Sequence, residues 1–87
     1  MTLSKARQIV RQGKTAFMWT ATLGNLDHHI AWSPDDRLIR ISYEQHGKWT
    51  PFVTLGPQWS PASDLFAAQL SVEDWAEHRE AKLKNVA

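Results

Sequence analysis

The side chains best suited to recognition chemistry in this chain are its tryptophans, five among 87 residues. An indole offers a flat apolar surface and one N–H donor, and it is hard to bury completely in a domain with so small an interior. Some of the five are therefore expected at the surface, stacked on a flat ligand or anchoring a partner protein, which favours a binding protein over a catalyst. The five are Trp19, Trp32, Trp49, Trp59 and Trp75.

The neighbours of each tryptophan predict different roles. Trp19 and Trp32 lie in alternating apolar segments, which favours core packing, although Trp19 is kept as a candidate ligand contact. Trp49 and Trp59 stand beside turn-forming and polar residues, so each is either packed or exposed in a pocket or interface. Trp75 follows two acidic residues and is either a plug for the core or the wall of a pocket.

Basic side chains offer a second kind of contact. Arg7, Arg11 and Lys14 are spaced to share one side of a helix, where they form either a phosphate site or an ordinary solvated surface. Arg40 is predicted on the same face of a hairpin as Trp49. Either it has a structural role, or its guanidinium holds a phosphate while the indole stacks on a base.

Other classes of site lack their signatures. The chain has no cysteine, and the adjacent His28 and His29 would point to opposite faces of a strand, so we expect no metal or other cofactor. It has no nucleophile elbow, Walker loop or dinucleotide fingerprint, so we expect no enzyme. A net charge of +1 argues against nucleic acid as a partner, and the longest apolar run, Ala16 to Trp19, is too short to cross a membrane. We expect a cytoplasmic protein.

The N-terminal third supplies the first elements that position these residues. Apolar spacing between Leu3 and Val10 predicts a short amphipathic helix that ends at Gly13. From Thr15 to Leu23 the period changes to two, which predicts a strand, and Gly24-Asn25 predicts a turn after it.

The middle of the chain predicts three further strands. Residues 29–32 form a short one, and residues 37–44 and 48–55 form a hairpin around His46-Gly47. With a two-residue loop, Glu44 lies opposite Trp49 and Arg40 opposite Val53, whereas a three-residue loop with a bulge shifts the pairing. Pro51 has no N–H for a ladder, so it belongs at an edge or a bulge.

The C-terminal third predicts short helical segments. Ser60-Pro61 is typical of a helix start, and Ser71 followed by Asp74 restarts the pattern as a capping-box variant. The charged tail over residues 78–87 extends as a frayed helix. The apolar stripe of the first segment is Leu65, Phe66 and Leu70.

We therefore predict one α+β domain over residues 1–87, with an N-terminal amphipathic helix, a small antiparallel sheet of about four strands and short C-terminal helical segments. Because a domain of this size often gains stability by association, we expect a homo-oligomer, either a dimer or a tetramer.

Taken in order, four short segments resemble the small phage-encoded Thoeris anti-defence proteins of the second type. The matches span most of the chain, from Ser4 to Trp75. The chain departs from that family in lacking its Gly-Trp-Asn-Gly motif. The matching segments are the opening that ends in Gln12-Gly13-Lys14, the strand Gly47–Phe52, the stretch Ser60–Leu65 and the closing Glu73-Asp74-Trp75.

The resemblance implies a homo-oligomeric sponge that binds a cyclic ADP-ribose-type signal, or a cyclic dinucleotide, without cleaving it and thereby silences a bacterial defence. It implies that indoles stack on a base and that Arg11 and Arg40 hold phosphates. It also implies that the carboxylates of Asp64 and Asp74 accept hydrogen bonds from ribose hydroxyls. The alternative is a phage inhibitor that acts by direct contact with a host defence complex, like an anti-CRISPR protein. A virion or assembly module, using its aromatics for self-association, is a third possibility.

Overall fold

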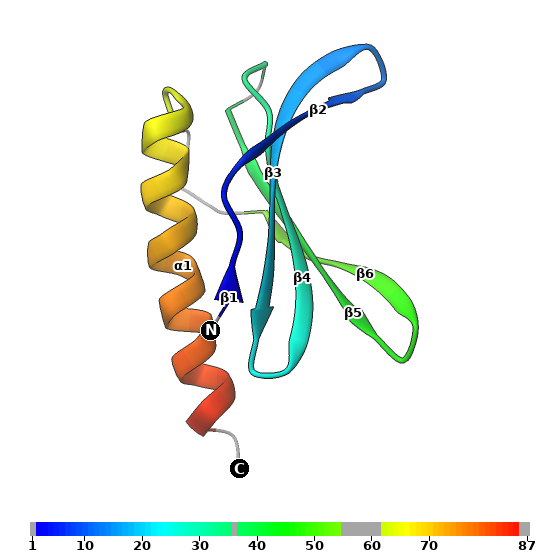
Figure 1. The fold of residues 1–87 in the computed structure, drawn as a ribbon, viewed down its shortest axis with the longest axis vertical. Helices are drawn as coiled ribbons and strands as arrows, with labels where there is room; N and C mark the ends of the chain where they lie inside the picture. The colour runs from blue at the N-terminus through cyan, green and yellow to red at the C-terminus, as the bar shows by residue number, and fades with distance from the viewer. Residues whose placement is uncertain (1, 36, 55–61, 86–87) are drawn as a thin grey trace.

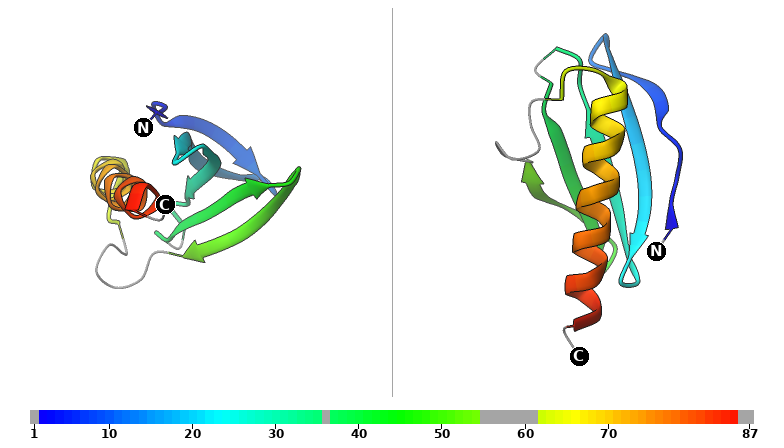
Figure 2. Two further views of the ribbon diagram at one scale, coloured as in Figure 1. Left: turned by 90° about the horizontal axis from the view of Figure 1, so that it is seen from below. Right: turned by 90° about the vertical axis from the view of Figure 1, so that its left-hand side faces the viewer.

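The computed structural model describes residues 2–35, 37–54 and 62–85. Those ranges contain one antiparallel sheet and one helix, α1 (Leu65–Asn85), which lies along one side of the sheet (Figures 1 and 2). The strand order is β1-β3-β4-β5-β6, and β2 pairs with the first half of β3. The strands are β1 (Thr2–Leu3), β2 (Arg7–Arg11), β3 (Lys14–Leu23), β4 (Leu26–Trp32), β5 (Ile39–Gln45) and β6 (Lys48–Thr54).

The hydrophobic core lies between the sheet and α1. Alternation along β3 and β4 turns Trp19, Leu23 and Ile30 toward the helix, where each is fully buried. The Trp19 indole keeps a hydrogen-bond partner there, because Nε1 donates to Gln69 Oε1 over 2.6 Å. Small side chains on the helix allow it to approach the sheet closely. They are Ala68, Val72 and Ala76.

Three tight turns connect the strands, and each has positive φ at both of its residues: Gln12-Gly13, Gly24-Asn25 and His46-Gly47. This is the geometry of a type I′ turn, whose twist matches that of a two-stranded ribbon. The predicted turn at Gly24-Asn25 and the predicted hairpin around His46-Gly47 are therefore confirmed.

The predicted N-terminal helix is wrong, because the segment forms strands β1 and β2. Apolar residues three and four apart fit a helix, but the β-branched pair Ile9-Val10 favours a strand. The Gln12-Gly13 turn then folds β2 back along β3, which completes a ladder from Arg7 to Arg11. Pairing with the neighbouring strand thus decides the conformation of a segment whose own apolar pattern is ambiguous.

The predicted sheet of about four strands and the short helical segments also need correction, because the sheet has six strands and α1 runs for 21 residues. The helix passes through Ser71 without a break. Phe66 and Leu70, predicted on its apolar stripe, are 73% and 52% exposed. Ser60-Pro61 lies outside the described residues, and Asp64 caps α1, with Oδ1 accepting from Ala67 N over 2.8 Å.

The register of the β5–β6 hairpin is as predicted near the turn and shifted beyond it. Glu44 lies opposite Trp49, but an irregularity between Ile41 and Ser42 places Arg40 opposite Thr54 instead of Val53. The shift follows Pro51, which cannot donate to the ladder and which lies on the edge strand beside this bulge.

Candidate functional site

The face of the sheet turned away from α1, which we call the outer face, carries the candidate site. The β2–β3 and β5–β6 hairpins both extend away from the helix in the left view of Figure 2. Residues that pair directly across strands share a face. The pairs Thr20–His29, His29–Ser42, Ala31–Arg40 and Glu44–Trp49 therefore place this set together on the outer face.

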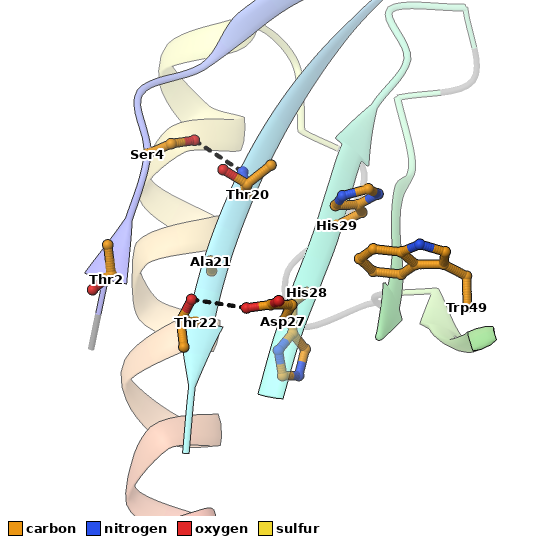
Figure 3. Close-up of a pocket in the computed structure, with 9 residues that line it drawn as sticks. All are labelled: Thr2, Ser4, Thr20, Ala21, Thr22, Asp27, His28, His29 and Trp49. Atoms are coloured by element: carbon orange, nitrogen blue, oxygen red, sulfur yellow. Dashed lines mark hydrogen bonds between the residues drawn. The ribbon is translucent and has the colours of Figure 1, made fainter. Parts of the chain in front are cut away.

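A hollow of about 340 Å³ on this face, the Trp49 hollow, lies over β3 and β4 between β1 and Trp49 (Figure 3). The Trp49 indole stacks on the His29 imidazole with ring centroids 3.8 Å apart and planes inclined by 23°. Trp49 is nevertheless 44% exposed, so much of its surface stays open to a ligand. The other side chains around the hollow include Thr2, Ser4, Thr20, Thr22 and Asp27.

Hydrogen bonds hold the polar rim of the Trp49 hollow in place. Ser4 Oγ accepts from Thr20 N over 2.9 Å, which ties the segment after β1 to β3. Thr22 Oγ1 donates to Asp27 Oδ1 over 3.0 Å, directly across the β3–β4 pair (Figure 3). The carboxylate is thus oriented by one oxygen, while its second oxygen can still accept hydrogen bonds.

Two further hollows, the basic hollows, continue along the outer face with volumes of about 280 and 560 Å³. Arg11 and Arg40 line both of them, and the larger one shares His29 with the Trp49 hollow. Lys14 adds a third cation, paired with Asp35 over 3.3 Å. The outer face is therefore aromatic and hydroxyl-rich at one end and cationic at the other.

Three residues predicted for the site come together on this face: Arg11, Arg40 and Trp49. Arg7, Arg11 and Lys14 also share a face as expected, although through strand pairing instead of helical spacing. Arg7 lies opposite Met18 and Arg11 opposite Lys14, on the outer-face register of β3.

The other predicted residues lie elsewhere. Trp19 is fully buried, and Trp75 is 8% exposed on the inner side, edge-on to His28. Asp64 is the helix cap described above. Asp74 lies on α1, where its carboxylate is 3.6 Å from His78 Nδ1. Trp59 lies outside the described residues.

Sequence reasoning missed Asp27 and His29 as site residues. The period-two alternation of β4 contained the signal, because Asp27 and His29 share a parity that opposes the buried His28, Ile30 and Trp32. The strand was predicted to begin only at His29, so its first outward-facing residue was not considered.

His28 borders the Trp49 hollow, but its ring lies on the helix side of β4. Its Nδ1 is 3.0 Å from the Leu26 carbonyl, and its Nε2 is 3.5 Å from Arg79 Nε. With Nδ1 protonated, the neutral ring donates to Leu26 and accepts from Arg79. Burial is the main cause that lowers the pKa of His28, and this also favours the neutral ring.

Within the described ranges, no group of three or more metal-ligating side chains converges on one point. No helix there is long and apolar enough to cross a membrane. Comparisons of the chain with protein-family models, curated proteins and solved structures gave no match.

Proposed function

We propose that this protein is a non-catalytic binding protein whose outer face holds an anionic ligand with a flat ring, of the nucleotide class. The observation that carries the proposal is the continuity between the exposed Trp49–His29 stack and the two hollows lined by Arg11 and Arg40. An indole recognises a base by stacking, and a guanidinium recognises a phosphate through paired hydrogen bonds.

The spacing of these groups suits a nucleotide. His29 and Ala31 are successive outer-face residues of β4, about 7 Å apart along the strand. Arg40 lies directly opposite Ala31 on β5. A base beside Trp49 and a phosphate beside Arg40 are then separated by roughly one sugar.

Sequestration requires affinity and no turnover, and the outer face supplies stacking, cationic and hydroxyl contacts of the kind that hold a ligand. The resemblance described above makes a cyclic ADP-ribose-type signal, or a cyclic dinucleotide, the first ligand to test. In the same proposal the protein acts in the cytoplasm of an infected bacterium, as an anti-defence sponge that assembles as a dimer or tetramer.

The direct test is a melting-temperature series with cyclic ADP-ribose isomers, cyclic dinucleotides, ADP-ribose and AMP. A selective rise that grows with ligand concentration supports the proposal, because a ligand that binds only the folded state stabilises it. Trp49→Ala and Arg40→Ala should reduce the rise, whereas Phe66→Ala and Lys82→Ala, which remove an exposed ring and a cation from α1, should leave it unchanged. The absence of a rise with every ligand at millimolar concentration would reject the proposal.

A second candidate function is inhibition through direct contact with a host protein. One observation favours it: Phe66 and Leu70 are one helical turn apart on α1 and are both exposed. Phe66→Ala combined with Leu70→Ala would abolish that activity and leave nucleotide binding intact, which distinguishes the two functions.

A further inference from the structure

The Trp49 hollow contains the carboxylate of Asp27, which neither stacks on a base nor attracts a phosphate. Asp27 is exposed and is the first outward-facing residue of β4, directly opposite Thr22 on β3. Its Oδ1 is occupied by Thr22 Oγ1, which fixes the plane of the carboxylate. The Asp27 side chain lines a hollow of about 340 Å³, which is large enough to hold a sugar ring.

A carboxylate in such a position is an acceptor for neighbouring hydroxyl groups. An ionised carboxylate accepts hydrogen bonds only, and bonds between a hydroxyl and a charged oxygen are stronger than bonds between neutral groups. Because an acidic side chain beside a phosphate repels it, Asp27 favours the neutral, hydroxyl-bearing part of a ligand. Dinucleotide-binding folds use an acidic residue in the same way, to hold the ribose 2′-hydroxyl.

The position of Asp27 relative to the cations gives this contact a direction. Asp27 and Ala31 are four residues apart along β4, about 13 Å, and Arg40 lies opposite Ala31. Trp49 contacts the strand from the side, at His29, which lies between them. In a nucleotide the 5′-phosphate and the 2′- and 3′-hydroxyls leave different edges of the ribose. A ribose over His29, with its base against Trp49, would therefore turn its phosphate toward Arg40 and its hydroxyls toward Asp27.

We propose that Asp27 forms a subsite for the ribose diol, the 2′- and 3′-hydroxyls, in the Trp49 hollow. Its carboxylate accepts hydrogen bonds from these hydroxyls and makes the protein selective for ribonucleotides over 2′-deoxyribonucleotides. Thr22 is the positioning residue, since its hydroxyl orients the carboxylate. This inference rests on the proposed function and names the sugar chemistry of its ligand.

The test compares AMP with 2′-deoxy-AMP by NMR titration, following the indole N–H signal of Trp49, which is suited to weak binding. We expect AMP to bind about tenfold more tightly, the effect of one hydrogen bond to a charged group. Asp27→Asn should bring the two affinities within about twofold of each other, because the neutral amide is a weaker acceptor. The Asn oxygen can still accept from Thr22, so this variant preserves the β3–β4 contact.

Glu77→Gln is the matched control, because it removes a carboxylate from the exposed side of α1 and should keep the tenfold preference. Equal binding of AMP and 2′-deoxy-AMP by the wild-type protein would overturn the diol subsite and leave the proposed function standing. If Asp27→Asn kept the preference for AMP over 2′-deoxy-AMP, the diol subsite would be wrong and another residue would have to recognise the 2′-hydroxyl. If neither nucleotide nor the cyclic signals bind, the proposed function and the diol subsite both fail.

Discussion

Arg79 on α1 contacts His28 on β4, with Arg79 Nε 3.5 Å from His28 Nε2, and this contact links the helix to the sheet. The contact requires a neutral imidazole, because a protonated Nε2 would point its proton at the guanidinium. The aromatic rings of Trp75 on α1 and Tyr43 on β5 pack beside the same histidine. Burial foremost, and the Arg79 charge as well, lower the pKa of His28, while the bond to Leu26 and the charge of Asp27 oppose this shift.

The pH dependence of stability follows from that lowered pKa. The unfolded chain takes up a proton at the ordinary histidine pKa of 6.5, whereas the folded protein does so only at lower pH. The stability contributed by neutral His28 is therefore complete above 6.5 and is lost as the pH falls from there toward the folded-state pKa. We expect a loss of at most about 1.4 kcal/mol per pH unit in urea unfolding.

The matched variants separate His28 from the other histidines. His28→Gln should flatten the pH dependence over about pH 5 to 7, whatever its effect on absolute stability. His46→Asn, in an exposed turn at positive φ that asparagine tolerates, should keep the wild-type slope. An unchanged slope in His28→Gln would show that another group carries the dependence.

A second prediction concerns the turn that touches the helix. Gly24 has φ of +55°, and a Cβ there would lie 2.5 Å from Leu83 Cβ, so Gly24→Ala has to displace the end of α1. We expect a loss of about 2–4 kcal/mol in unfolding free energy, from overpacking together with the backbone cost. Gly47 has φ of +77° and no atom within 4 Å of an added Cβ. Gly47→Ala should therefore lower the unfolding free energy only through the backbone cost, by about 1–2 kcal/mol. Equal losses of unfolding free energy in the two variants would show that the Leu83 side chain moves aside without an energetic cost.

A third prediction tests the division of the tryptophans between the two faces of the sheet. Trp19→Ala should cost about 3–5 kcal/mol, since it opens a cavity and leaves Gln69 without its indole partner. Trp49→Ala should cost less than about 1 kcal/mol, because the indole is 44% exposed and its main contact is a single stack. Urea unfolding measures both, and a large loss in Trp49→Ala would place that ring in the fold rather than at a binding surface.

The sequence predicted those parts of the fold that depend on local pattern. Alternation and turn chemistry were sufficient for the strand that contains Trp19, for the Gly24-Asn25 turn and for the hairpin around His46-Gly47. The segment from Leu3 to Val10 could not be decided locally, because its pattern suits a helix and only pairing with β3 makes it a strand. The buried side of α1 was misjudged for a related reason: alanines face the sheet, while the larger Phe66 and Leu70 face outward.

The candidate site was predictable only in part, for a similar reason. Arg40 and Trp49 belong to one hairpin, so a correct turn placed them on one face. Arg11 joins them through the β2–β3 hairpin, which sequence reasoning had made a helix. Asp64 and Asp74 were chosen by resemblance, but both belong to the helix side, and Asp27 is the carboxylate at the Trp49 hollow.

The last prediction separates the cationic end of the outer face from its aromatic end. Arg11→Ala and Arg40→Ala should each weaken binding of AMP by about tenfold, and leave binding of adenosine nearly unchanged, because only AMP carries the phosphate. Trp49→Ala should weaken the binding of both ligands alike, since it removes the stacking surface that they share.

The wild-type preference for AMP over adenosine should also shrink as salt is raised, because the charges of the exposed arginines are screened. Calorimetry at two salt concentrations measures all three effects, with Lys82→Ala as the control cation on α1. If Arg40→Ala weakened adenosine as much as AMP, the guanidinium would be shaping the face instead of binding the phosphate, and the anion would have to be sought at Arg11 and Lys14 alone.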